Sequence, residues 1–121
     1  MIIKREQQNI LIELSRQYPV VTITGPRQSG KTTLVQSVFP DFQYFSMEDP
    51  DIREIAISDP RQFLNKHDKG MILDEIQKTP ELLSYIQGIV DKHKNPGMFI
   101  LTGSQQFDLH NKISHLPLLT L

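Results

Sequence analysis

The chain has 121 residues, a length that suits one folded domain and is too short for two. Hydrophobic residues make up 38% and charged residues 22%, and the formal net charge of −1 gives no overall attraction to nucleic acid or to anionic membranes. Cysteine is absent, which excludes disulfide bonds and thiolate metal sites, and no segment approaches the roughly 18 apolar residues that span a bilayer. Charged residues follow Met1 almost at once, so we expect no signal peptide, no membrane partner and a cytoplasmic location.

The first part of the chain alternates between helical and extended patterns. Apolar residues at helical spacing predict a helix over residues 5–16, with an inward face formed by Ile10, Leu11, Leu14 and Tyr18. A short β-branched run over 20–24 predicts a buried strand, followed by a loop over 25–30. Helical spacing then resumes and continues to Pro40.

The second part repeats this alternation with clearer boundaries. Strands are predicted at 42–46, 71–73 and 98–102. Between them, three helix starts each combine a capping residue with a following proline, at Asp49-Pro50, Asp59-Pro60 and Thr79-Pro80. The final apolar run, Leu116–Leu121, is interpreted as the start of a fifth strand.

Strands that alternate with helices require crossover connections, and crossovers produce a parallel sheet with helices on both faces. The predicted fold class is therefore α/β, in three layers, as one domain over residues 1–121. Ligands of such sheets bind at the carboxyl ends of the strands. The motifs described next all lie at such ends.

The loop after the first strand matches the phosphate-binding P-loop (Walker A) pattern G-x-x-x-x-G-K-[ST] at every fixed position. Its two fixed glycines let the backbone approach phosphate oxygens, while successive N–H groups and the following helix N-terminus point toward the anion. Lys31 is expected to contact the β and γ phosphates and to act as a catalytic residue. The Thr32 hydroxyl is expected to bind Mg²⁺. The predicted nucleotide-binding residues are Gly25, Pro26, Arg27, Gln28, Ser29, Gly30, Lys31, Thr32 and Thr33.

Two adjacent acids end the strand at 71–73, as in the Walker B motif. We expect Asp74 to hold Mg²⁺ directly or through water, and Glu75 to orient the water that attacks the γ-phosphate. At the end of the strand at 98–102, Thr102 and Ser104 are candidates for the catalytic polar residue called sensor 1 in additional-strand P-loop ATPases. In those folds this strand lies between the P-loop strand and the Walker B strand.

Four stretches resemble the N-terminal AAA-type ATPase domain of a widespread prokaryotic family whose members commonly carry a C-terminal domain of unknown function. These stretches are 24–33, 48–51 with 59–60, 73–77, and 101–105. The resemblance implies an additional-strand P-loop fold, ATP and Mg²⁺ as cofactors, and ATP hydrolysis. AAA-type domains often form rings, so a homo-oligomer is the corresponding expectation.

The chain departs from this family after Gln105. An expected arginine, a further strand and the C-terminal domain are missing, so the chain is interpreted as a truncated ATPase core. An arginine finger can increase the rate of nucleotide hydrolysis by roughly 10³- to 10⁵-fold. We therefore expect ATP binding without fast turnover.

Two other functions are consistent with the same loop. One is a non-hydrolysing module in which the nucleotide acts as a switch. The other is a small-molecule kinase, which would need an arginine-rich lid that is not apparent in this chain. The paired acids favour activation of water, and therefore hydrolysis, over the kinase.

Overall fold

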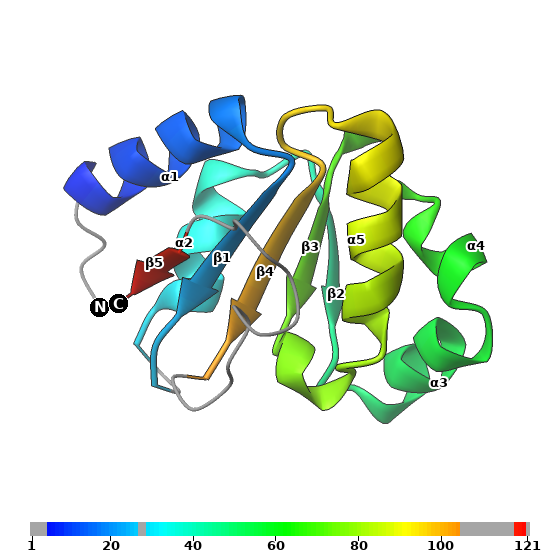
Figure 1. Ribbon diagram of the computed structural model, residues 1–121. Helices are drawn as coiled ribbons and strands as arrows, with labels where there is room; N and C mark the ends of the chain where they lie inside the picture. Colours follow the sequence, from blue (N-terminus) through cyan, green and yellow to red (C-terminus); the bar gives the residue numbers. More distant parts are fainter. Residues whose placement is uncertain (1–4, 27–28, 105–117, 121) are drawn as a thin grey trace.

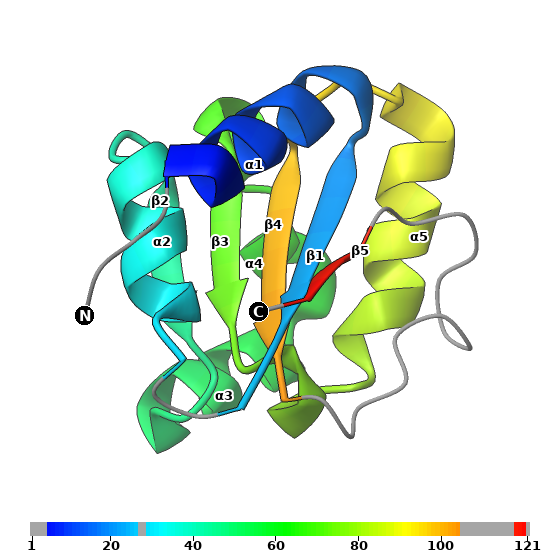
Figure 2. The ribbon, with the colours of Figure 1, turned by 90° about the vertical axis from the view of Figure 1, so that its left-hand side faces the viewer.

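The computed structural model describes residues 5–26, 29–104 and 118–120. Five parallel strands form a sheet with helices on both faces (Figure 1). Turned by 90°, the molecule shows α1 and α2 on one side of the sheet and α5 on the other (Figure 2). The elements are α1 Arg5–Gln17, β1 Val20–Thr24, α2 Lys31–Val38, β2 Gln43–Ser46, α3 Pro50–Ser58, α4 Pro60–Leu64, η1 His67–Lys69, β3 Met71–Asp74, η2 Ile76–Lys78, α5 Leu82–His93, β4 Phe99–Gly103 and β5 Leu118–Thr120. The three-layer α/β/α fold predicted from the sequence is confirmed.

The central strands are buried along their whole length because both of their faces are covered. Every residue of β1, β3 and β4 is buried. Side chains alternate between the faces, so Val20 packs in a cluster with Leu82 and Ile86 of α5. Its neighbour Val21 packs in a second cluster with Leu34 of α2. The sheet thus separates two hydrophobic cores.

The strand order β2-β3-β4-β1-β5 decides where the functional motifs meet. As expected for the additional-strand class, β4 lies between the P-loop strand β1 and the acidic strand β3. In register, Thr24 pairs with Gly103, and Ser46 pairs with Asp74. The carboxyl ends of β1, β3 and β4 therefore lie side by side at the lower edge in Figure 1. The expected fifth strand is also present, and it pairs with β1.

Two of the three predicted helix starts have the expected caps. The Asp49 side chain accepts a hydrogen bond from the Asp51 N–H at 2.9 Å, and Asp59 accepts one from the Gln62 N–H at 3.3 Å. The third prediction was wrong, because α5 begins at Leu82 without a side-chain cap. The Thr79 hydroxyl instead donates to the carbonyl of Ile76 at 3.4 Å, which closes the short turn η2.

The sequence predicted more buried residues on α1 than the structure has. Leu11 is fully buried, but Ile10 and Tyr18 are 41% and 39% exposed. Tyr18 also lies beyond the end of the helix at Gln17. Because α1 packs mainly on β1 and α2, a narrow apolar stripe is sufficient to attach it.

Candidate functional site

The loop between β1 and α2 has the backbone geometry that its glycines allow. Gly30 adopts φ 90°, in the left-handed region that side chains disfavour. The Gly25 N–H donates to the carbonyl of Gly103 at 3.3 Å, which ties the start of the loop to the end of β4. Lys31 begins α2, so the free N–H groups of its first turn lie beside the loop. Arg27 and Gln28, predicted to bind nucleotide, lie outside the described residues.

The predicted catalytic residues Lys31 and Glu75 form a buried ion pair. Lys31 Nζ lies 3.2 Å from Glu75 Oε2, and the two side chains are only 4% and 8% exposed. A buried ammonium is costly unless an anion accompanies it. Glu75 therefore supplies, in this structure, the negative charge that a bound phosphate would bring.

Glu75 has an unusual backbone conformation, and hydrogen bonds to two other residues hold it in place. Its backbone adopts φ 56° and ψ 53°, a left-handed geometry that is uncommon for a residue with a side chain. The Glu75 N–H donates to Thr102 Oγ1 at 2.9 Å, and Gln77 Nε2 donates to Glu75 Oε1 at 2.9 Å. Strained backbone of this kind is concentrated at functional sites, where the surrounding structure maintains it.

Asp74 accepts hydrogen bonds from three hydroxyl groups. Thr32 Oγ1 lies 3.1 Å from Asp74 Oδ2, and the Tyr44 hydroxyl donates to the same oxygen at 2.5 Å. Thr102 Oγ1 donates to Asp74 Oδ1. The two residues predicted to bind Mg²⁺, Thr32 and Asp74, are thus in direct contact.

The two candidates at the end of β4 have different surroundings. Thr102 is fully buried, and it links the two acids by accepting from the Glu75 N–H and donating to Asp74. Ser104 follows β4 and is half-buried. A contact of either residue with a γ-phosphate stays a prediction.

Tyr44 is a site residue that the sequence analysis did not find. Burial raises the pKa of its hydroxyl above the usual value, and the hydrogen bond and negative charge of Asp74 raise it further. The hydroxyls of Ser46 and Thr32 oppose this with smaller effects. Tyr44 therefore stays protonated and donates to Asp74 at physiological pH. The alternation along 42–46 puts Tyr44 on the same face as Ser46, but only the register with β3 places it near Asp74.

The donors at this site fit a magnesium ion that is held mainly by a nucleotide. Among the described residues, no group of three or more His, Cys, Asp and Glu side chains forms a complete metal cage. Mg²⁺ typically keeps several waters and uses one or two carboxylates together with substrate phosphates. One carboxylate and one hydroxyl, beside a phosphate-binding loop, match that pattern.

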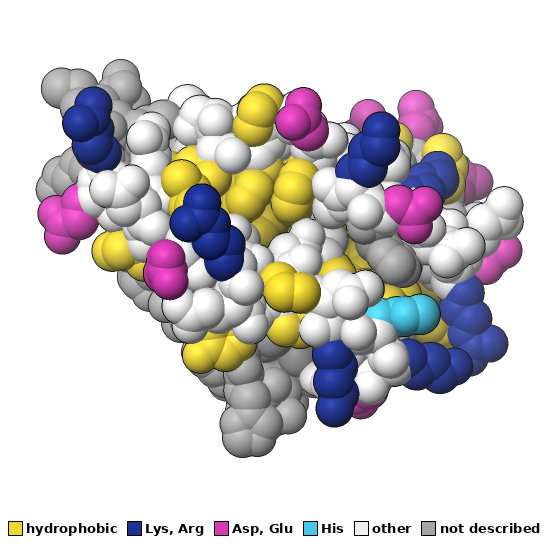
Figure 3. Space-filling view, turned by 90° about the horizontal axis from the view of Figure 1, so that it is seen from above, with side chains coloured by type: hydrophobic (Ala, Val, Ile, Leu, Met, Phe, Trp, Pro, Cys, Tyr) yellow, Lys and Arg dark blue, Asp and Glu magenta, His cyan; other side chains and the backbone are white. Residues whose placement is uncertain are grey.

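Two hollows of the described structure lie away from this site. One, of about 880 Å³, is lined by α4 and α5 residues that include Arg61 and Tyr85. Another, of about 490 Å³, lies at the amino ends of the strands and includes Phe39 and Phe42. Figure 3 views this opposite edge, where hydrophobic side chains gather near the middle. Neither hollow contains a motif residue.

A search of the described helices for a membrane-spanning segment found none with the required length and hydropathy.

Comparison with known proteins agrees with this geometry. The family model of an AAA domain matches residues 17–117. Uncharacterized proteins of Mycobacterium bovis and Mycobacterium tuberculosis are each 33% identical over 112 residues, which is 90% of this chain and 25% of either relative. The chain thus spans about a quarter of the length of these curated relatives.

Solved structures share the fold at low sequence identity. The DnaC helicase loader is similar with a TM-score of 0.63 and 16% identity, over 100% of this chain and 93% of that one. AMPPCP-bound DnaA from Aquifex aeolicus is similar with a TM-score of 0.59 and 18% identity, over 95% of this chain and 43% of that one. At these identities the likeness supports the fold.

Proposed function

Because the chain belongs to the AAA domain family, we propose that it binds ATP with Mg²⁺ where β1, β3 and β4 end. The observation that carries this proposal is the buried Lys31 ammonium at the start of α2, paired with Glu75 at 3.2 Å. A buried charge needs an anionic partner, and a bound phosphate can take the place of Glu75 beside Lys31. A triphosphate is the anion that this loop geometry suits.

In the proposed complex each residue has a distinct role. The loop N–H groups and Lys31 bind the β and γ phosphates, and Lys31 exchanges Glu75 for phosphate. Thr32 and Asp74 would hold Mg²⁺, and the ion would supply positive charge to the phosphate oxygens. Once released from Lys31, Glu75 is free to accept a proton from the attacking water. Thr102 keeps the two acids in their relative positions.

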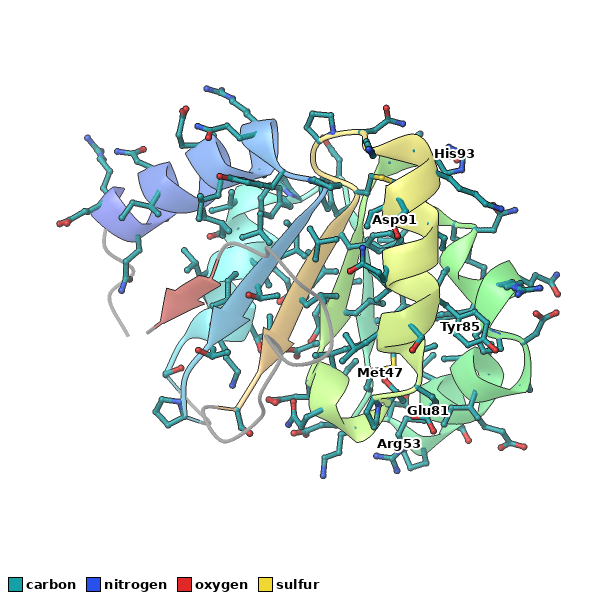
Figure 4. The ribbon with its side chains drawn as sticks, viewed as in Figure 1. Met47, Arg53, Glu81, Tyr85, Asp91 and His93 are labelled. Atoms are coloured by element: carbon teal, nitrogen blue, oxygen red, sulfur yellow. The ribbon has the colours of Figure 1, made fainter. Side chains whose placement is uncertain are left out.

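Hydrolysis is the finer part of this proposal, and we expect it to be slow. Arg53 of α3 donates to the carbonyl of Met47 at 3.1 Å, and Figure 4 labels both residues. Arg61 lies over the ring of Tyr85 at 5.7 Å. Neither of these two contacts is with a residue of the candidate site. Homo-oligomer formation and a cytoplasmic location also remain predictions.

Calorimetric titration with Mg-ATP tests binding, with Lys31→Ala as the variant and the exposed Lys92→Ala as the matched control. Loss of a charge-assisted hydrogen bond costs about 1.5–3 kcal/mol, so we expect Lys31→Ala to bind at least about 10-fold more weakly. Circular dichroism checks that the variant is folded. Absence of saturable binding to the wild-type chain would contradict the proposal.

A nucleotide switch without turnover is the second candidate, and the Lys31–Glu75 ion pair favours it. ATP must break this pair, so binding changes the surroundings of Glu75 whether or not hydrolysis follows. Phosphate release by the wild type and by Glu75→Gln separates the candidates. Hydrolysis predicts release that the variant abolishes, whereas a switch predicts binding with no release by either protein.

A further inference from the structure

Tyr44 reaches the candidate metal site from the neighbouring strand. It lies on β2, where the register pairs it with Ile72 and pairs Ser46 with Asp74. Its ring packs against the core cluster that contains Ile72, on the face covered by α1 and α2. From there the hydroxyl extends diagonally to Asp74 Oδ2 at 2.5 Å. The ring is anchored by packing, so the hydroxyl has a fixed place.

The donors around Asp74 come from three separate elements. Thr32 approaches from α2, Tyr44 from β2 and Thr102 from β4. A carboxylate has about four acceptor positions, so these hydroxyls use most of them and fix its orientation. Thr32 and Tyr44 share Oδ2. When the Thr32 oxygen turns toward a metal ion, Tyr44 is the donor that continues to hold Oδ2.

We propose that Tyr44 is a positioning residue for the magnesium site and acts by holding Asp74 beside Thr32. This inference rests on the proposed function. The tyrosine itself touches neither metal nor nucleotide in this scheme, and it contributes by keeping the carboxylate in place before the ion arrives. Outer partners of this kind typically change metal affinity by about 10- to 100-fold when they are removed.

Tyr44→Phe tests the proposal because it removes the hydroxyl and keeps the packed ring. The Mg²⁺ concentration that supports binding of a fluorescent ATP analogue should rise about 10- to 100-fold. Affinity for the same analogue in EDTA should stay unchanged, because Lys31 and the loop amides are intact. The matched control is Tyr85→Phe on α5, at a residue labelled in Figure 4. The Tyr85 ring lies under the Arg61 guanidinium. That variant should match the wild type in both measurements.

Tyrosine fluorescence gives a readout that needs no nucleotide. The chain has three tyrosines and no tryptophan, so tyrosine emission is not masked. A carboxylate that accepts the phenolic hydrogen bond quenches tyrosine emission. Asp74→Asn should therefore raise the emission of the wild type and leave that of the Tyr44→Phe background unchanged. Equal increases in the two backgrounds would show that the Tyr44–Asp74 contact is absent in solution and would overturn the inference.

The outcomes separate the two proposals. If the wild type binds no nucleotide, the proposed function fails and this inference fails with it. If the wild type binds the nucleotide with Mg²⁺ and Tyr44→Phe has the same magnesium dependence, the positioning role alone is wrong. A higher Mg²⁺ concentration required by Tyr44→Phe, with unchanged affinity in EDTA, supports it.

Discussion

Glu75→Gln should make the nucleotide-free protein less stable while it strengthens nucleotide binding. The charged atoms of Lys31 and Glu75 are 3.2 Å apart and almost entirely buried. At an effective dielectric constant of about 20, Coulomb attraction over that distance is about 5 kcal/mol before the cost of desolvation. Removing one partner of a buried pair typically costs about 3–5 kcal/mol, because the other charge stays buried and unpaired. We expect a loss of about 3 kcal/mol.

The same substitution has the opposite effect on the complex. Phosphate supplies the missing negative charge to Lys31, so the bound variant avoids the penalty that the free variant carries. By linkage, ATP affinity should rise by up to the same 3 kcal/mol, or about 100-fold. For a chain of this size the melting temperature without nucleotide should fall by roughly 10–15 °C. Mg-ATP should recover most of that loss.

Thermal unfolding followed by circular dichroism, with and without Mg-ATP, measures both effects, and calorimetry gives the affinity. Glu54→Gln is the matched control, because it removes one negative charge from an exposed position on α3. Suppose instead that Glu75→Gln melts at the wild-type temperature and binds ATP with unchanged affinity. The buried ion pair would then be absent in solution, and the reasoning from it would be refuted.

Two further predictions concern residues that shape the site and the sheet. Thr102→Val removes the hydroxyl that links the acids, so urea unfolding should show a loss of about 1–3 kcal/mol, whereas Thr102→Ser should retain most of the stability. Gly70→Ala should be strongly destabilising, because Gly70 has φ 91° and an added Cβ would lie 2.3 Å from the Phe42 ring. Gly88→Ala in α5 meets open space and should stabilise the protein by about 0.4–1 kcal/mol, so equal effects of the two glycine substitutions would contradict this account.

Local signals in the sequence were enough to predict most elements and the outline of the site. The caps at Asp49 and Asp59 act within their own helix turns, so spacing along the chain was sufficient to identify them. The loop glycines and the two acids at the end of β3 were predicted as site residues in the same way. Thr79 was mispredicted because its hydroxyl has a competing acceptor, the carbonyl of Ile76, three residues earlier.

Local signals of this kind could not predict the contacts between different strands. Tyr44 stands among Phe42 and Phe45, and nothing local distinguishes the ring that turns toward an acid from those that fill the cores. The register between β2 and β3 makes that distinction. The ion pair between Lys31 and Glu75 likewise depends on the position of β4 between β1 and β3. Periodicity defines the faces of an element, but pairing decides which faces meet.

The candidate site contains one cationic and two anionic side chains, and ATP would change how they are paired. Lys31 is paired with Glu75, while Asp74 is held by hydroxyls rather than by a cation. In the proposed complex, a polyanionic nucleotide takes Lys31 from Glu75 and so leaves this carboxylate unpaired near the phosphates. Mg²⁺ can offset part of the resulting repulsion through Thr32 and Asp74. Binding therefore needs the metal more than a bare phosphate loop would. Rapid hydrolysis needs one further positive charge, which the described contacts of Arg53 and Arg61 do not provide.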